Sequence, residues 1–249
     1  MRTIIACMVI VGSLLGFTGI ASASHKTEQD KMTFIKVNDL GYIGAKPSQF
    51  EMVGCGNSTN TKCTPGQIPI YTSYWALKRN AANLKGKTIL FDQEHWSYTP
   101  AREYDNPVYY AEQIAKLCKA DNIKLIFTGS RRGTENEIAI YDAAAQYGAR
   151  EIAIQSQRND GTLKKFRQYL STVMGSIREV NSSVPIIAGI ATDAGGSPIS
   201  ASQMVKDYNY AYTRVAGFWL NSPEWPEGQG CAPEGCPATA RQFLKDIHA

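Results

Sequence analysis

Short apolar, β-branched runs alternate with amphipathic segments along most of this chain. Eight runs have the length and alternation of strands, at 33–37, 50–54, 68–72, 88–92, 124–128, 151–155, 185–190 and 215–220. Amphipathic helical patterns occur at 107–120, 134–147, 163–180, 200–215 and 237–247. This order predicts parallel strands with right-handed crossovers, and therefore a closed (β/α)8 TIM barrel. The first three runs leave little room for helices, so the first crossovers are either reduced or misread.

The N-terminus has the pattern of a secretory signal peptide. A charged Arg2 precedes an apolar run over 4–20, and Ala21-Ser22-Ala23 follows as a small-residue cleavage site. The alternative is a membrane anchor, but glycines and polar residues interrupt the run and the cleavage site follows at once. We therefore expect residues 1–23 to be removed. The mature chain, 24–249, would be a single domain that is secreted, extracellular or periplasmic, and not bound to a membrane.

The cysteines agree with export. Two local pairs lie in loops rich in Gly, Pro, Asn and Thr, Cys55 with Cys63 and Cys231 with Cys236, and they predict two disulfides. Cys118 falls within a helical pattern, which favours a small buried hydrophobe over a nucleophile. Neither pair has zinc-site spacing and the three histidines are scattered, so we expect no metal and no other cofactor.

Composition excludes few functions. The chain has 249 residues, 43% hydrophobic and 19% charged, with a formal net charge of +4 that is spread along its length. Such mild basicity gives no reason to expect nucleic acid as a partner. No linker or internal repeat divides the chain, and the length suits one barrel. The oligomeric state stays open.

Two acids end the fourth predicted strand. Because side chains alternate across a strand, Asp92 and Glu94 share one face with Leu90. The carboxyl ends of parallel strands are where ligands bind, so the acid pair predicts a catalytic site. Two close carboxylates push one pKa up, which suits one acid to proton donation. The alternative is a solvated acidic loop.

Other predicted strand ends carry amides, acids, a cation and an indole. These candidate substrate-binding residues are Gln155, Gln157, Asp193, Trp219, Asn221 and Arg131, with Trp96 and Tyr98 in the loop after the acid pair. Amides and acids bond hydroxyls while aromatic faces cover a sugar ring, so the set predicts a carbohydrate substrate or ligand. The alternatives are glutamines that satisfy loop backbone, a core tryptophan, a solvated arginine and a turn aspartate.

The same loop contains Glu103 and the dipeptide Asn106-Pro107. Glu103 is either a second working carboxylate or part of a structured loop whose Asn106-Pro107 begins the next helix.

The order of these strand ends resembles the chitinase-type glycoside hydrolases, particularly the plant class III chitinases and their non-catalytic relatives. The family's fourth-strand motif, Asp-x-x-Asp-x-Asp-x-Glu, places its last two acids on Asp92 and Glu94. Its sixth-strand Gln-x-Tyr falls on Gln155-Ser156-Gln157, and its final Gly-x-x-x-Trp strand is similar to 215–219. The resemblance covers roughly 88–221.

The resemblance implies a β-linked polysaccharide or oligosaccharide as substrate, with or without N-acetyl groups. Glu94 would protonate the glycosidic oxygen, Asp92 would orient the 2-acetamido group that attacks the anomeric carbon, and Trp219 would lie under the sugar ring. Leu90 stands where the family has an inner acid, and Gln157 replaces its tyrosine. The sequence therefore predicts a secreted glycoside hydrolase, and the alternative is a non-catalytic carbohydrate- or protein-binding barrel.

Overall fold

The structure is a computed structural model. It describes residues 32–36, 41, 43–46, 48, 50–55, 63–94, 97–129, 134–194, 196–222 and 231–247. The predicted signal peptide, Trp96 and Arg131 lie outside the described residues. None of the described helices combines the length and the apolarity needed to cross a bilayer.

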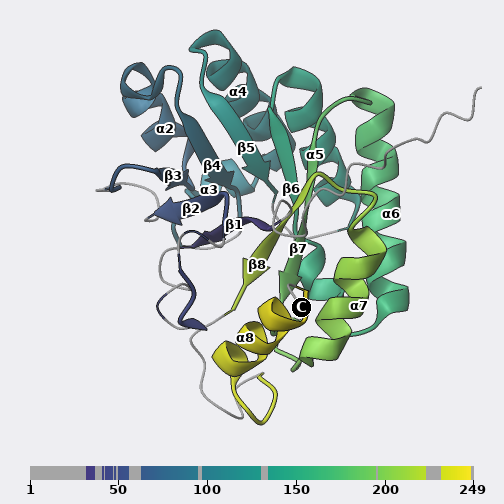
Figure 1. The fold of residues 1–249 in the computed structure, drawn as a ribbon. Coiled ribbons are helices and arrows are strands. Elements are labelled where there is room, and N and C mark those ends of the chain that lie inside the picture. The colour runs from purple at the N-terminus through teal and green to yellow at the C-terminus, as the bar shows by residue number, and fades with distance from the viewer. Residues whose placement is uncertain are drawn as a thin grey trace, which may run out of the picture.

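A curled sheet of parallel strands forms the centre of the fold (Figure 1). Neighbouring strands pair in chain order, and β1 also pairs with β8, which closes the sheet into a barrel. The α/β fold with a curled parallel sheet, which the sequence predicted, is confirmed. The strands are β1 (Met32–Lys36), β2 (Met52–Cys55), β3 (Gln67–Tyr71), β4 (Thr88–Asp92), β5 (Lys124–Thr128), β6 (Glu151–Ile154), β7 (Ile186–Ala191) and β8 (Gly217–Asn221).

Helices cover the outside of this sheet. The elements are α2 (Tyr74–Asn80), η3 (Ala81–Leu84), α3 (Ala101–Tyr104), α4 (Pro107–Ala120), α5 (Thr134–Tyr147), η4 (Ser156–Asn159), α6 (Leu163–Val180), α7 (Ala201–Ala211) and α8 (Cys236–Ile247). The predictions for α4, α5 and α6 are confirmed at both ends. The sequence analysis missed α2, and its prediction of 200–215 was too long. In the described part of the chain, β2 leads to β3 without a named helix.

The barrel strands separate two apolar sets. Ile89 and Phe91 of β4 pack outward with the helices, whereas Leu90 faces the barrel interior, which confirms the predicted alternation. The interior set contains four isoleucines, one leucine, one alanine and one tryptophan. It consists of Ile68, Ile70, Leu90, Ile126, Ala153, Ile187 and Trp219.

The cysteines form the predicted disulfides, Cys55–Cys63 and Cys231–Cys236, with Cα atoms 5.6 and 5.0 Å apart. Cys118 is a free, fully buried thiol of α4, and burial raises its pKa to about 12. A thiol that stays protonated is a poor nucleophile, so its role is packing.

Two aspartates, Asp160 and Asp207, are buried and interact electrostatically with each other. Asp160, which follows η4, accepts a hydrogen bond from the backbone N–H of Ala191 at 2.8 Å. Asp207 of α7 accepts from the side-chain amide of Gln203 at 3.0 and 3.1 Å. Burial raises the pKa of Asp160 well above its usual range and that of Asp207 to about 7. Arg167 and Lys206 act in the opposite direction on Asp207.

Asp207→Asn should change how stability depends on pH. Because the native state holds the Asp207 proton up to about pH 7 while an unfolded aspartate loses it near pH 4, folding binds a proton in that window. Stability conferred by this group is therefore present at low pH and is lost as pH rises toward 7, by at most about 1.4 kcal/mol per pH unit. Urea unfolding at pH 4, 5, 6, 7 and 8 measures the difference between wild type and variant.

Asp246→Asn is the matched control. Asp246 also accepts from a glutamine four residues earlier, Gln242, at 2.6 Å, but on the exposed face of α8. The free energy of unfolding of Asp207→Asn should rise relative to that of wild type as pH rises, and the difference should become constant above pH 7. For the control, the difference from wild type should be the same at every pH. A constant offset for Asp207→Asn would show that Asp207 titrates normally.

Candidate active site

The acid pair lies at the mouth of the barrel, where β4 ends. Because Leu90 faces the interior, the alternation directs Asp92 inward above it. Asp92 is only 2% exposed, whereas the side chain of Glu94 is 20% exposed. The two carboxylates therefore differ in their access to a ligand, since Asp92 is enclosed by the barrel and Glu94 reaches the surface.

Residues from the end of β6 hold Glu94. The side-chain amide of Gln155 donates to Glu94 Oε1 at 2.6 Å, and Arg158 Nη2 lies 3.6 Å from Oε2. Sequence reasoning found Gln155 but missed Arg158, which the short helix η4 brings back toward β4. The only signal for Arg158 was its position three residues after a strand-end glutamine.

A buried tyrosine fixes Gln155 from the outer layer. The hydroxyl of Tyr141, on α5, accepts a hydrogen bond from the backbone N–H of Gln155 at 2.9 Å. Burial raises the pKa of Tyr141, and the charges of Glu137 and Glu94 act in the same direction. Tyr141 therefore stays neutral and keeps the strand end, and with it the amide that bonds Glu94, in place.

Gln157 and Trp219 form the floor of the mouth, and Gly189 of β7 lies directly beside them. A Cβ atom on Gly189 would lie 2.3 Å from Trp219 Nε1 and 2.4 Å from Gln157 Oε1. The indole N–H donates to the carbonyl of Ile154 at 3.4 Å. Trp219 is 5% exposed and Gln157 3%, so both are buried parts of the floor and not projecting contacts at the rim.

Several polar atoms of the mouth lack partners within the described structure. Thr128 Oγ1, Gln155 Oε1 and Gln157 Oε1 are buried without a hydrogen bond there. Leaving a buried polar group unsatisfied costs about 1–3 kcal/mol, so such atoms mark places for water or a ligand. Together with Asp92 and Glu94 they favour a ligand with several hydroxyl or amide groups.

The remaining candidate substrate-binding residues, Asp193, Asn221 and Tyr98, differ in burial and in local structure. Asp193 Oδ1 accepts from the backbone N–H of Gly196 at 2.5 Å, as expected for a turn residue. Burial raises the pKa of Asp193, while the Gly196 and Ser197 amides and the Arg158 charge lower it. Asn221, at the end of β8, is partly buried, and Tyr98 is 50% exposed at the rim. Their ligand contacts stay predictions.

Glu103 has a structural role. Its carboxylate accepts from the hydroxyl of Ser73 at 3.0 Å and from the backbone N–H of Tyr74 at 2.6 Å, at the start of α2. Its backbone carbonyl accepts from the side chain of Gln93 at 3.4 Å. Of the two interpretations of Glu103, the structured-loop one fits, because the carboxylate caps a helix and is 1% exposed.

The described residues contain no group of three His, Cys, Asp or Glu side chains that could hold a metal ion. The charged groups of the mouth in this part of the chain are Asp92, Glu94, Asp193 and Arg158. Proton transfer and hydrogen bonding are the chemistry that this arrangement offers from its own side chains.

No family model and no curated protein matches this chain. A truncated 3-deoxy-D-arabino-heptulosonate 7-phosphate synthase from Thermotoga maritima is 10% identical with a TM-score of 0.44, and the match covers 88% of this chain and 86% of that one. Morphinone reductase is 12% identical with a TM-score of 0.43, covering 79% and 80%. The carboxyl transferase domain of Rhizobium etli pyruvate carboxylase is 13% identical with a TM-score of 0.40, and the match covers 74% of this chain and 34% of that one. At such identities and scores, nothing about activity follows.

Gly189→Ala should destabilise the floor. The added methyl group overlaps the indole of Trp219, which is enclosed by the barrel, so we expect a loss of about 1–3 kcal/mol, as for other overpacked cores. Urea unfolding, with tryptophan fluorescence to follow the indole, measures it.

Gly175→Ala is the control for this glycine substitution. Gly175 lies on the exposed side of α6 with nothing within 4 Å of an added Cβ. At this position the glycine-to-alanine change should stabilise α6 by about 0.5–1 kcal/mol. Equal effects of the two substitutions would contradict the close approach of Trp219 to β7.

Proposed function

We propose that this protein is a secreted glycoside hydrolase with a (β/α)8 barrel, acting on a β-linked, N-acetylated glycan. The observation that carries the proposal is the unequal acid pair. Glu94 is partly exposed and held by Gln155, while Asp92 lies enclosed on the same inward face. Glycoside hydrolysis requires a positioned acid that reaches the glycosidic oxygen and a second carboxylate near the reacting ring.

In the proposed reaction, Glu94 donates a proton to the glycosidic oxygen as the bond to the anomeric carbon breaks. The carbonyl oxygen of the substrate's 2-acetamido group forms the new bond to that carbon, and Asp92 holds the N–H of the group. Water then attacks the anomeric carbon, the bond from this carbon to the acetamido oxygen breaks and the amide is restored, and the proton lost by the water returns to Glu94. Gln155 keeps the carboxyl group of Glu94 oriented, and Arg158 acts as a positioning residue on its second oxygen.

Secretion is part of the same proposal. The structure contains two disulfides, and such bonds persist in oxidising compartments. The N-terminal segment has the charge, apolar core and cleavage site of a signal peptide. We propose that the mature protein meets its glycan outside the cytoplasm.

A non-catalytic binding barrel is the second candidate, and the floor of the mouth favours it. Leu90, below Asp92, packs among apolar side chains, so in the described structure no third carboxylate lies under the acid pair. Gln157, which stands where the chitinase-type family has a tyrosine, is buried against Trp219 and Gly189. These features predict saturable glycan binding without turnover.

Product release from a panel of β-linked glycans, including N-acetylglucosamine polymers, tests the enzyme. Glu94→Gln removes the transferable proton while keeping the side chain's size, so turnover should fall at least 100-fold, in the range expected for loss of a general acid. The rate is measured from reducing ends, at several pH values, for wild type and variant.

Glu179→Gln is the matched control. Glu179 is exposed in the last turn of α6, far along the helix from the barrel mouth, and the substitution should leave turnover unchanged. Binding of each glycan is measured in parallel by calorimetry. Binding without turnover in wild type would favour the binding barrel, and turnover unaffected by Glu94→Gln would contradict the assigned acid.

A further inference from the structure

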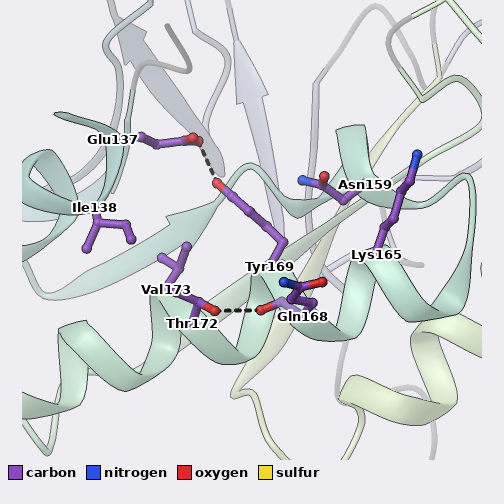
Figure 2. Close-up of a pocket in the computed structure, with 8 residues that line it drawn as sticks. All are labelled: Glu137, Ile138, Asn159, Lys165, Gln168, Tyr169, Thr172 and Val173. Carbon is purple, nitrogen blue, oxygen red and sulfur yellow. Dashed lines mark hydrogen bonds between the residues drawn. The ribbon is translucent and has the colours of Figure 1, made fainter. Parts of the chain in front are cut away.

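A hollow lies outside the barrel, between α5 and α6. Figure 2 shows its lining side chains, which come from both helices and from the end of η4. Its volume is about 280 Å³. Drug-sized ligands occupy pockets of about 300–1,000 Å³, so this hollow suits a smaller molecule.

A buried acid forms one wall of the hollow. Glu137, on α5, is only 4% exposed, and the hydroxyl of Tyr169, on α6, donates to its Oε1 at 2.5 Å (Figure 2). An ionised carboxylate has about four acceptor positions, and burying it is costly unless donors surround it. The Glu137 carboxylate and the Tyr169 hydroxyl place polar atoms on this side of the hollow.

The other polar groups provide donors and acceptors around the same space. Lys165 contributes an ammonium group, and the side chains of Asn159 and Gln168 contribute amides. Val173 and the ring of Tyr169 add apolar surface. The charges of the Glu137 carboxylate and the Lys165 ammonium group sum to zero. The lining therefore gives no electrostatic preference for a charged ligand over a neutral one.

We propose that this hollow is an accessory binding site for one neutral sugar ring. Neighbouring hydroxyls of a pyranose both donate and accept, which matches a carboxylate, two amides and an ammonium group, while its C–H face matches Tyr169 and Val173. The choice of a sugar over another small polyol rests on the proposed glycan-degrading function. Binding at this site does not depend on Glu94.

The short helix η4 separates the accessory site from the mouth. Arg158 of η4 pairs with Glu94 on the barrel side, and the next residue, Asn159, lines the hollow. Glu137 also acts electrostatically on Tyr141, whose hydroxyl holds the backbone of Gln155. The two sites are therefore neighbours that share supports but no lining side chain.

NMR titration of the full-length mature protein, labelled with ¹⁵N, tests the accessory site. The probes are glucose, N-acetylglucosamine and the N-acetylglucosamine dimer, and glycine is included as a small zwitterion. We expect saturable shifts of backbone amides in α5 and α6 with a Kd on the order of 1 mM, a modest affinity for so small a ligand. Glu94→Gln should show the same shifts and Kd.

Variants locate the binding. Thr172→Trp places a large ring in the hollow from an exposed position of α6, and it should weaken binding at least tenfold. Lys165→Ala should weaken binding at least threefold. Its control, Lys164→Ala, changes the adjacent exposed lysine, which does not line the hollow, and should bind as wild type does.

Each outcome decides the question. Shifts that saturate only around Glu94, an unchanged Kd in Thr172→Trp, or no shifts with any sugar at 100 mM would overturn the proposal, as would a preference for glycine. If the wild-type protein shows no glycan turnover but sugars still shift the amides of α5 and α6, only the proposed hydrolase is contradicted. Intact turnover without that binding would contradict only the accessory site.

Discussion

The packing of Trp219 against Gly189 is the constraint on which the mouth of this barrel depends. A closed sheet of eight strands has an interior that its own side chains fill, and here one indole occupies a large share of it. The indole fits because the facing position of β7 has no side chain at all. This close approach also places Gln157 beside the indole and sets the depth of the floor.

Above this floor, one amide connects two distant strand ends. Gln155 bonds Glu94 through its side chain and Tyr141 through its backbone, so the geometry of the acid depends on packing in the outer helical layer. The acids themselves are unequal, because Asp92 is enclosed and Glu94 reaches solvent. A general acid and a positioning partner need this kind of difference, and a binding barrel could use the same groups to hold hydroxyls. Turnover decides between them.

The segment between β6 and α6 carries more of the site than its length suggests. In Ser156–Asn159 and the following aspartate, successive side chains serve the floor, the acid, the outer hollow and the end of β7. A tight helical turn points neighbouring residues in different directions, so a few positions reach several layers of the barrel. The two proposed sites consequently share one support.

Local pattern was sufficient for much of this protein. The period of apolar residues predicted β4, β5, α4, α5 and α6 at their observed ends, and the alternation along β4 placed Leu90, Asp92 and Glu94 on one face, because both depend only on neighbouring residues. The seven-residue α2 was missed because so short a helix has little periodicity, and its capping acid, Glu103, comes from α3, about thirty residues away. The ion pair of Arg158 with Glu94, the close approach of Trp219 to Gly189 and the hollow between α5 and α6 were equally beyond the sequence. They are contacts between residues far apart in the chain, and only closure of the barrel decides which of those residues meet.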